Sequence, residues 1–427
     1  MQNHHRKRVI IVGGGFGGLA AANAMSGSEL DVILIDRTNH HLFQPLLYQV
    51  ATAALSPADI ASASRSLLAR AGNVSVILEE VVGVDADRKQ VLTAKSGKVA
   101  FDYLVLATGA DYSFFGHNEW QPVAPVLKTL DDALGIRERL LSAFEAAEGA
   151  DNTTDVEPLL TFAVIGGGPT GVELTGAIAE LTRAMLKSNY RRLSSSKVRI
   201  LLVEAGPRVL SAFTENQSQY ALKALRAHGV EVILSAAVEH IDAYGMVVAD
   251  TRISTQNVFW AAGTQARPAG AWLGAECARN NSIKVLDDCS VPGHPDIFAI
   301  GDVSSYQIGG KPLPGLAPVA KQQGRYVGRL IIARAAGRKT SRAFRYRNWG
   351  TMAVIGRSKA IADFGWLRLR GYPAWAAWSM VHLFLLIDFR SKLTVYVNWA
   401  WAWFTRGRGA RLLTRTVARR PDATRTR

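Results

Sequence analysis

Three glycines near the N-terminus have the spacing of a dinucleotide-binding turn. Gly13, Gly15 and Gly18 form a GxGxxG pattern directly after a short apolar run. The first glycine permits a tight turn, the second lets the backbone approach a pyrophosphate, and the third lets the next helix pack closely on the strand. Asp36 ends the following apolar run, 23 residues after Gly13, where a carboxylate can pair with the two ribose hydroxyl groups. The pattern predicts a dinucleotide site.

The same pattern returns in the middle of the chain. A second apolar run precedes Gly166, Gly168 and Gly171, and Glu204 ends the strand that follows. The acid is 38 residues after Gly166, more than the usual spacing of about 20. We attribute the excess to an inserted loop over residues 188–197. Two such sites in one chain are more specific than one, and the alternative is a vestigial repeat.

Buried strands must position these turns, and further apolar runs supply them. One run ends in Thr108-Gly109, a second leads to Gly263, and a third ends in Gly301-Asp302. We expect the Thr108 turn to return beside the first glycine-rich turn. The acid of the third run would accept a hydrogen bond from a sugar hydroxyl, and a plain turn aspartate is the alternative.

These elements predict an α/β fold with two Rossmann-like dinucleotide-binding domains and a C-terminal amphipathic helical module. A connecting helix is expected over residues 127–148. The predicted parts are 1–120 (first domain, first part), 121–290 (second domain), 291–340 (first domain, second part) and 341–427 (C-terminal module with a basic tail).

Charge is distributed unevenly along the 427 residues, whose formal net charge is +15. The part from Arg334 onwards carries 20 Lys and Arg against three acids, and seven of the ten Trp. Its Trp residues stand inside apolar runs and are not interleaved with Lys and Arg, which favours lipid over nucleic acid. The two cysteines, Cys277 and Cys289, form no CxxC pair, which argues against a disulfide framework and a metal site.

Two apolar segments near the C-terminus, 371–387 and 393–405, are shorter than the roughly 20 residues that cross a bilayer. Arginines flank both. This pattern is typical of helices that lie in the membrane interface, with Trp at headgroup depth and Arg against anionic lipid. A buried core helix is the alternative for the first segment. The tail 406–427 is expected to be partly disordered and to add electrostatic attachment.

The chain resembles the type II NADH:quinone oxidoreductases, within the two-dinucleotide flavoproteins that include glutathione reductase. The resemblance rests on the following segments: 39–49 (NHHLFQPLLYQ), 166–173 (GGGPTGVE), 313–324 (LPGLAPVAKQQG), Phe389-Arg390 and 398–401 (NWAW). No cysteine precedes Cys277, so electrons cannot pass to a dithiol near the first domain, as they do in disulfide reductases.

The resemblance implies non-covalent FAD in the first domain and NADH as substrate in the second. The residues implied for FAD are Gly13, Gly15, Gly18, Asp36, Thr108, Gly109 and Asp302. Those implied for NADH are Gly166, Gly168, Gly171, Glu204 and Gly263. Glu204 would pair with a free 2′-hydroxyl and repel a 2′-phosphate, which favours NADH over NADPH, although Arg208 nearby could weaken this preference.

The resemblance also assigns a catalytic role to Glu173, at the contact between flavin and nicotinamide. The alternative is compensation of the helix dipole, since we place Glu173 in the first turn of its helix. The implied quinone residues are Pro318, Lys321, Gln322 and Gln323. Pro318 replaces a glutamine of the family motif, so the polar contact to a quinone carbonyl falls to the other three. A solvated lysine is the alternative for Lys321.

The resulting expectation is a peripheral enzyme on the cytoplasmic side of the cell membrane, without proton pumping. Its expected partners are a membrane quinone, ubiquinone or menaquinone, and an anionic lipid surface, and a homodimer is allowed. Three alternatives stay open: a sulfide:quinone oxidoreductase, a soluble reductase of a small iron–sulfur protein, and a non-catalytic NADH-responsive flavoprotein.

Overall fold

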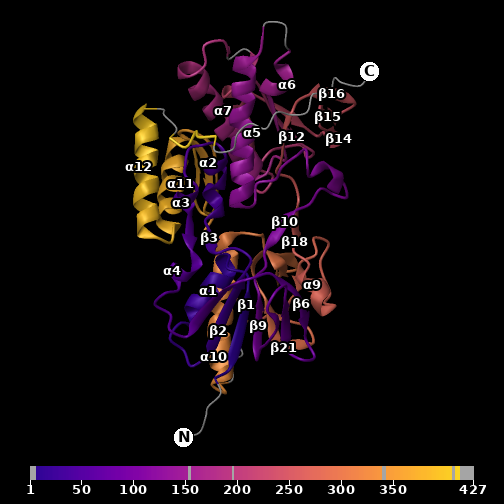
Figure 1. The fold of residues 1–427 in the computed structure, drawn as a ribbon, viewed down its shortest axis with the longest axis vertical. Coiled ribbons are helices and arrows are strands. Elements are labelled where there is room, and N and C mark those ends of the chain that lie inside the picture. The colour runs from indigo at the N-terminus through magenta and orange to yellow at the C-terminus, as the bar shows by residue number, and fades with distance from the viewer. Residues whose placement is uncertain (1–5, 152–154, 195–196, 339–342, 406–408, 414–427) are drawn as a thin grey trace. The chain divides into compact units, whose positions relative to one another are not determined.

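The computed structural model describes residues 6–151, 155–194, 197–338, 343–405 and 409–413. The chain forms two compact units, each assembled from three stretches of sequence (Figure 1). The first unit contains Met1–Phe43, Ala61–Ser113 and Gly263–Gly350. The second contains Gln44–Ile60, Phe114–Ala262 and Thr351–Arg427.

A six-stranded sheet in the order β20-β21-β9-β1-β2-β5 is the centre of the first unit. Its strands are β1 (Arg8–Val12), β2 (Asp31–Asp36), β5 (Val74–Leu78), β9 (Tyr103–Leu106), β20 (Ser290–Val291) and β21 (His294–Ala299). All pairs except β20–β21 are parallel. Successive residues of a strand face opposite sides of the sheet, so Val9 and Ile11 enter one apolar cluster while Ile10 and Val12 enter another.

Helices α1 (Phe16–Met25) and α10 (Ala317–Ala335) pack against each other in the first unit (Figure 1). Glycines allow their backbones to approach. A Cβ placed on Gly324 would lie 2.2 Å from the carbonyl oxygen of Gly17, and one on Gly328 would lie 2.8 Å from Ala24 Cβ. The middle of α10 therefore cannot carry bulky side chains at these two positions facing α1.

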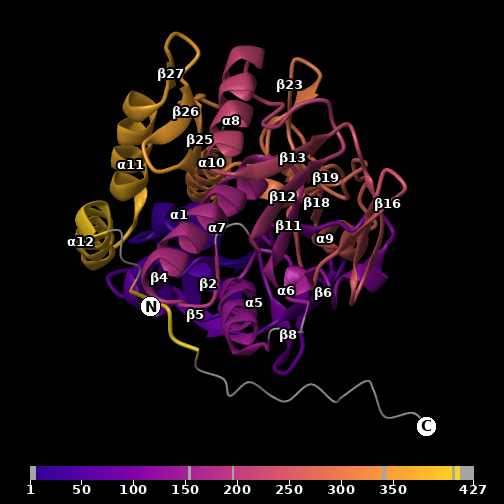
Figure 2. The same cartoon turned by 90° about the horizontal axis from the view of Figure 1, so that it is seen from above.

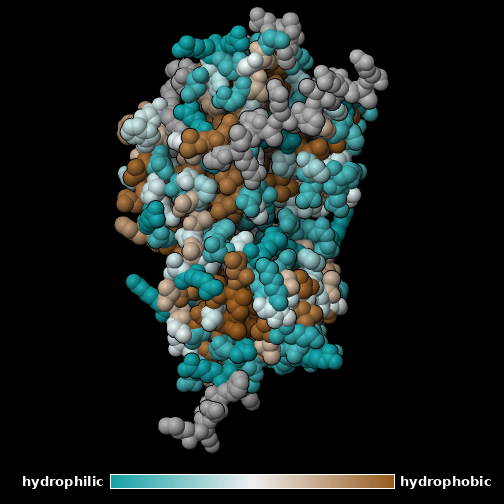
Figure 3. All heavy atoms as spheres, in the orientation of Figure 1, coloured by the Kyte–Doolittle hydropathy of each residue, from teal (hydrophilic) through white to brown (hydrophobic). Residues whose placement is uncertain are grey.

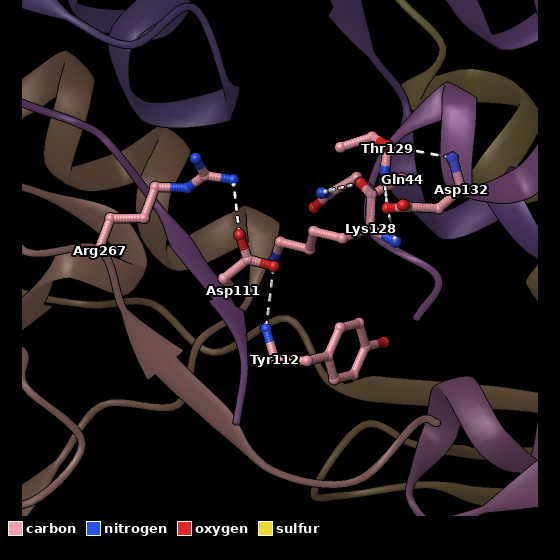
Figure 4. A network of polar contacts seen from close by, with 7 residues as sticks. All are labelled: Gln44, Asp111, Tyr112, Lys128, Thr129, Asp132 and Arg267. Carbon is pink, nitrogen blue, oxygen red and sulfur yellow. Dashed lines mark hydrogen bonds and ion pairs between the residues drawn. The ribbon is translucent and has the colours of Figure 1, made fainter. Parts of the chain in front are cut away.

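Short elements complete the first unit. They are β3 (His40–Leu42), β4 (Ala61–Ala63), α4 (Ser64–Leu67), β6 (Val81–Asp85), β7 (Gln90–Thr93), β8 (Gly97–Ala100), β10 (Ala110–Tyr112), β18 (Thr264–Ala266), α9 (Ala269–Leu273), β19 (Ile283–Lys284), a 3₁₀ turn Gly301–Val303, β22 (Ser304–Ser305), β23 (Gln307–Ile308) and β24 (Lys311–Pro312). β10 pairs with β18, and Arg267 forms an ion pair of 3.1 Å with Asp111 beside this pairing (Figure 4).

The second unit has a parallel sheet in the order β13-β12-β11-β17. Its elements are η1 (Gln44–Leu46), α2 (Leu47–Ala51), α3 (Pro57–Ile60), η2 (Asn118–Trp120), α5 (Leu130–Gly149), α6 (Glu157–Leu160), β11 (Thr161–Ile165), α7 (Pro169–Ser188), β12 (Arg199–Glu204), α8 (Glu215–Ala227), β13 (Val230–Leu234), β14 (Val238–Asp242), β15 (Gly245–Val248), β16 (Thr251–Ser254) and β17 (Asn257–Trp260).

The C-terminal part of the second unit is a small antiparallel sheet followed by two helices. The sheet contains β25 (Thr351–Gly356), β26 (Lys359–Asp363) and β27 (Arg368–Arg370), and the helices are α11 (Tyr372–Leu385) and α12 (Phe389–Thr405). Figure 2 shows α11 beside this sheet, with α12 next to it. The edge strand β25 lies against α7, which covers an edge that would otherwise offer unpaired backbone groups.

The predicted α/β class with Rossmann-like parallel sheets is confirmed, and several predicted boundaries move. The connecting helix begins at Leu130 and not at 127, because Thr129 and Asp132 form a capping box there (Figure 4). The long gap before Glu204 comes mainly from the helix, since α7 has 20 residues and α1 has ten. Most of the predicted tail, 406–408 and 414–427, lies outside the described residues.

Candidate functional site

The first glycine-rich turn is shaped so that only glycine fits at two of its positions. Gly13 has a φ of +105°, and a Cβ there would lie 2.3 Å from the carbonyl oxygen of Ala107. A Cβ on Gly18 would lie 1.8 Å from the Gly13 oxygen. At Gly15, which precedes the first turn of α1, no heavy atom lies within 4 Å of such a Cβ. This open position leaves room for a phosphate at the helix N-terminus.

Asp36 holds this turn from the end of β2. Its carboxylate accepts hydrogen bonds from Gly14 N at 2.5 Å, from Thr38 N at 2.6 Å and from Thr38 Oγ1 at 2.7 Å. A carboxylate has about four acceptor sites, so it can also accept a hydrogen bond from a ribose hydroxyl. The acid therefore both orders the loop and offers the contact that its position predicts.

The other residues predicted for FAD come from the same edge of this sheet. β21, β9, β1 and β2 are neighbours, so Asp302, Thr108, Gly13 and Asp36 all follow the carboxyl ends of adjacent strands, where α/β sheets bind ligands. The hydroxyl of Thr108 is buried without a hydrogen-bond partner, and Gly109 has a φ of +73°. An orphaned buried hydroxyl beside an open glycine turn fits a polar cofactor such as FAD.

His41 belongs to this site, although the sequence alone assigns it no specific role. It is buried, its Nδ1 is 3.0 Å from the carbonyl oxygen of Gly14, and its Nε2 has no partner. Burial lowers the pKa of His41, so the ring is neutral near pH 7 and Nδ1 donates to the carbonyl. Nε2 is then a free acceptor. The only sequence signal was the polar pair His40-His41 after a buried strand.

The four predicted quinone residues lie in the first two turns of α10. Pro318 is half-buried. Lys321 places its ammonium 5.5 Å from the centre of the Phe16 ring. Gln322 is paired with the backbone of Arg347 through two hydrogen bonds of 2.9 Å. These residues share one helix, but their side chains do not have the same surroundings.

Gln323 is fully buried. Its Oε1 accepts a hydrogen bond of 2.7 Å from Gly301 N, and its Nε2 lies 3.3 Å from Ser304 Oγ. Its amide therefore holds the turn that carries Asp302. In this structure Gln323 supports the predicted FAD turn, whereas Lys321 is only partly buried.

The second glycine-rich turn, in the other unit, repeats the first in detail. Gly166 has a φ of +110°, and its Cβ would lie 2.8 Å from the oxygen of Ala261. A Cβ on Gly171 would lie 1.8 Å from the Gly166 oxygen, whereas Gly168 is open. As in the first turn, two positions have no room for a Cβ atom and the third has open space around it, which fits a second dinucleotide.

Glu204 plays the part of Asp36 in this turn. Its carboxylate accepts hydrogen bonds from Gly167 N at 2.5 Å and from Gly206 N at 2.7 Å. Arg208 donates to the carbonyl oxygen of Ser211 at 2.8 Å, so its guanidinium is engaged within its own turn. Gly263, with a φ of +68°, follows Ala261 by two residues, where the chain leaves this unit.

Glu173 lies in the second turn of α7, not in the first as expected, because the helix already begins at Pro169. The dipole-compensation alternative is therefore weakened, since that effect is confined to the first turn. Burial of the carboxyl group raises the pKa of Glu173 to about 8, and a hydrogen bond of 3.4 Å from Val354 N opposes this shift. The group therefore carries a proton at neutral pH.

The last helix, α12, has an unusual distribution of side chains. Its inward face makes polar contacts: Asn398 Nδ2 donates to Asp59 at 3.1 Å and Trp399 Nε1 donates to Gln49 Oε1 at 2.8 Å. Its outward face is apolar, as the brown spheres along this edge in Figure 3 show. Exposed apolar side chains on α11 and α12 are Tyr372, Met380, Phe384, Phe389, Leu393, Tyr396, Val397, Trp401 and Phe404.

Neither helix of this pair could cross a bilayer, and the same holds for every helix among the described residues. The described residues also contain no cluster of His, Cys, Asp and Glu able to bind a metal ion. Of the two cysteines, Cys289 is buried in the apolar cluster of the first unit. Cys277 is partly buried, and its Sγ would lie 2.4 Å from a Cβ on Gly270.

Comparisons with known proteins identify the family of this chain. The family model of the pyridine nucleotide-disulphide oxidoreductases matches residues 7–324. Two proteins of Mycobacterium tuberculosis, the type II NADH:quinone oxidoreductases Ndh and NdhA, are 38% and 39% identical to this chain. Their alignments cover 97% and 96% of the chain and 91% and 90% of those proteins.

Solved structures show the same fold at lower identity. The NDH2 structure from Plasmodium falciparum in complex with NADH aligns with a TM-score of 0.86 at 22% identity, covering 95% of this chain and 99% of that one. The sulfide:quinone oxidoreductase from Aquifex aeolicus aligns with a TM-score of 0.73 at 18% identity, covering 94% and 96%. The fold alone does not distinguish the NDH2 proteins from the sulfide:quinone oxidoreductase. The two M. tuberculosis proteins, which match nearly the whole chain at 38% and 39% identity, do distinguish them. The chain therefore belongs to the type II NADH:quinone oxidoreductases of the pyridine nucleotide-disulphide oxidoreductase family.

Proposed function

We propose that this protein oxidises NADH and reduces a membrane quinone while bound to the membrane surface. The observation that carries the proposal is the pair of matching glycine-rich turns, each closed by an acid at the next strand end. When bound, FAD would supply the redox chemistry that links NADH oxidation to quinone reduction. The residues of the chain bind and orient the two dinucleotides.

Overall, NADH, quinone and one proton give NAD⁺ and quinol. Glu173 is suited to deliver this proton, since its pKa of about 8 keeps it protonated near pH 7 while leaving it able to release the proton. The alternative role of Glu173, compensation of the helix dipole, is disfavoured because this residue lies in the second turn of α7. We therefore assign Glu173 as the proton-holding residue.

An anaerobic half-reaction experiment tests this function. Purified yellow protein is mixed with NADH while the flavin absorbance is followed, and a short-chain quinone is then added. Bleaching followed by rapid return of the colour is expected. Bleaching without return would keep the NADH reaction but redirect the search to sulfur, an iron–sulfur protein or a signalling partner.

For the quinone site we propose Lys321 as the polar contact, because this residue is only partly buried. Gln322 and Gln323 are committed to the Arg347 backbone and the Gly301 turn. Lys321→Met should raise the KM for quinone and leave the rate of flavin bleaching by NADH unchanged. An equal slowing of both half-reactions would remove Lys321 from the quinone site.

The outward apolar face of α11 and α12 is proposed to lie in the membrane interface on the cytoplasmic side. Polar groups anchor the inner face of α12 to Asp59 and Gln49, while the outer face exposes aromatic and aliphatic side chains. Lys392 places its ammonium 5.2 Å from the centre of the Phe384 ring, a position from which it can also reach lipid phosphate. A homodimer stays a prediction, to be checked by light scattering in detergent.

Point changes test this surface more sharply than deletion from Arg370 onwards, which would remove the buried residues Trp378 and Val395. Leu393→Glu with Trp401→Glu should abolish co-flotation with vesicles of phosphatidylglycerol, since burial of each side chain is worth about 2 kcal/mol. FAD content should stay unchanged. The matched control is Tyr244→Glu, an equally exposed aromatic of the β14–β15 turn in the same unit. Undiminished flotation at high salt would contradict the proposal.

A further inference from the structure

One face of α7 is pressed directly against the edge strand β25. Three positions along this face, Glu173, Gly176 and Glu180, are spaced by three and four residues, which places them on one side of a helix. Each meets a successive part of the strand or its turn. Glu173 accepts from Val354 N, Gly176 touches Ile355, and Glu180 accepts from Arg357 N.

Gly176 is the position at which the two backbones come closest. A Cβ placed there would lie 1.8 Å from the carbonyl oxygen of Ile355 and 2.8 Å from its carbonyl carbon. The obstacle is backbone, which cannot move aside as the end of a flexible side chain could. Any residue other than glycine at position 176 must therefore push β25 away from α7.

The strand β25, which can pack on α7 only because residue 176 is glycine, also lies over Glu173. Val354 donates to Glu173 Oε1 across 3.4 Å, and Gly176 is one helical turn beyond Glu173. We propose that Gly176 is a positioning residue: its missing side chain lets β25 lie on α7 and thereby shields the Glu173 carboxyl group from water. This inference rests on the proposed function, in which Glu173 holds the proton.

The pKa of Glu173 is shifted by burial and by the hydrogen bond from Val354 N, and not by a neighbouring charge. β25 carries no ionisable side chain, and α2, which also contacts α7, contributes only Tyr48. Glu180 is bound to the backbone of the β25–β26 turn, and Arg357 in that turn stacks on Trp403, 4.3 Å from the ring centre. His228 lies beside Glu180, and burial lowers its pKa. Shielding from water therefore dominates at Glu173.

The experiment follows the protonation of Glu173 directly, in the FAD-containing enzyme, by infrared spectroscopy of the protonated carboxyl band between pH 4 and 10. The band is assigned by its absence in Glu173→Gln. In the wild type it should disappear with a midpoint near pH 8. In Gly176→Ala the midpoint should fall by about one pH unit or more, because the group regains water. The pH profile of quinone reduction should shift by the same amount.

Gly135→Ala is the matched control, because Gly135 is also inside a helix of this unit but a Cβ there would meet nothing within 4 Å. It should leave the midpoint unchanged. An unshifted midpoint in a folded Gly176→Ala would overturn the inference. If that variant does not fold, a wild-type midpoint near 4.5, the ordinary value for Glu, would overturn it as well.

This design separates the inference from the proposed function. A shifted infrared midpoint in Gly176→Ala, combined with normal quinone reduction by Glu173→Gln, would leave Gly176 as the residue that admits β25 but remove Glu173 from the reaction. Slow quinone reduction by Glu173→Gln, combined with an unshifted midpoint in Gly176→Ala, would keep Glu173 in the reaction but show that Gly176 does not control its protonation.

Discussion

The two glycine-rich turns are nearly identical, but the elements that cover the following helices differ. In the first unit α1 is covered by another helix, α10, through Gly324 and Gly328. In the second unit α7 is covered by the edge strand β25 through Gly176. The contact between α1 and α10 is largely apolar, whereas the contact between α7 and β25 includes the carboxyl group of Glu173. The turn thus defines what kind of ligand binds, and the cover decides what chemistry the neighbouring side chains can do.

This difference suits the separate tasks that we propose for the two units. With FAD in the first unit, the cofactor would stay bound through every cycle. With NADH in the second unit, the nucleotide would enter and leave, and quinol formation would need a proton donor. A partly buried Glu173 with a raised pKa meets this need.

The largest expected effect comes from filling the third glycine of either turn. Gly18→Ala and Gly171→Ala each place a methyl group 1.8 Å from a backbone oxygen, at a cost of about 3 kcal/mol, equivalent to a roughly hundredfold loss of affinity. Gly18→Ala should give protein with little FAD, measured by the absorbance ratio at 450 and 280 nm. Gly171→Ala should stay yellow but bleach only slowly with NADH.

Gly135→Ala, in the open part of α5, serves as the control for both variants. If Gly171→Ala lost FAD as completely as Gly18→Ala, the two turns would not act as separate sites, and the comparison would fail.

A smaller effect is expected when the trapped carboxyl group is neutralised. The pKa of Glu173 is about 8 in the folded protein and near 4.5 in the unfolded chain. Between these values the folded state binds more protons, so the wild type loses stability as pH rises from 4.5 to 8 and not beyond. Glu173→Gln, which does not titrate, should therefore gain stability relative to the wild type as the pH rises, with a larger advantage at pH 9 than at pH 5.

The measurement is denaturant unfolding of the FAD-containing proteins at pH 5 and pH 9. The advantage of Glu173→Gln should be small at pH 5. An advantage that is equal at both pH values would show that Glu173 has an ordinary pKa. The exposed acid Glu231, replaced by Gln, provides a comparison without burial.

The smallest effect concerns the acids that close the two turns. Glu204→Ala should reduce the ratio of kcat/KM for NADH over NADPH about tenfold, because it removes about 1.4 kcal/mol of hydrogen bonding to the ribose. Asp36→Ala should leave that ratio unchanged and weaken FAD retention instead. Steady-state kinetics with both nucleotides checks the first, and gel filtration in mild denaturant checks the second. Unchanged discrimination in Glu204→Ala would show that this acid does not contact the ribose.

The sequence alone determined the parts of this protein that depend on local chemistry. Glycine spacing, apolar runs and an acid at a strand end predicted both dinucleotide turns, since positive φ angles and close backbone approach admit only glycine. The arginine-flanked apolar segments predicted two C-terminal helices, and both are present. The long gap before Glu204 was misread, because helix length is set by packing along the sheet and not by the turn.

Only the tertiary structure decided what each polar side chain does. Gln323 resembled a quinone contact but is buried under the Gly301 turn, whereas His41 was passed over although it touches the first glycine-rich turn. β25 begins 178 residues after Glu173, and no sequence pattern shows that this strand would settle on α7. Burial and hydrogen bonding arise between segments distant in sequence, so the proton affinity of Glu173 is a property of the folded unit.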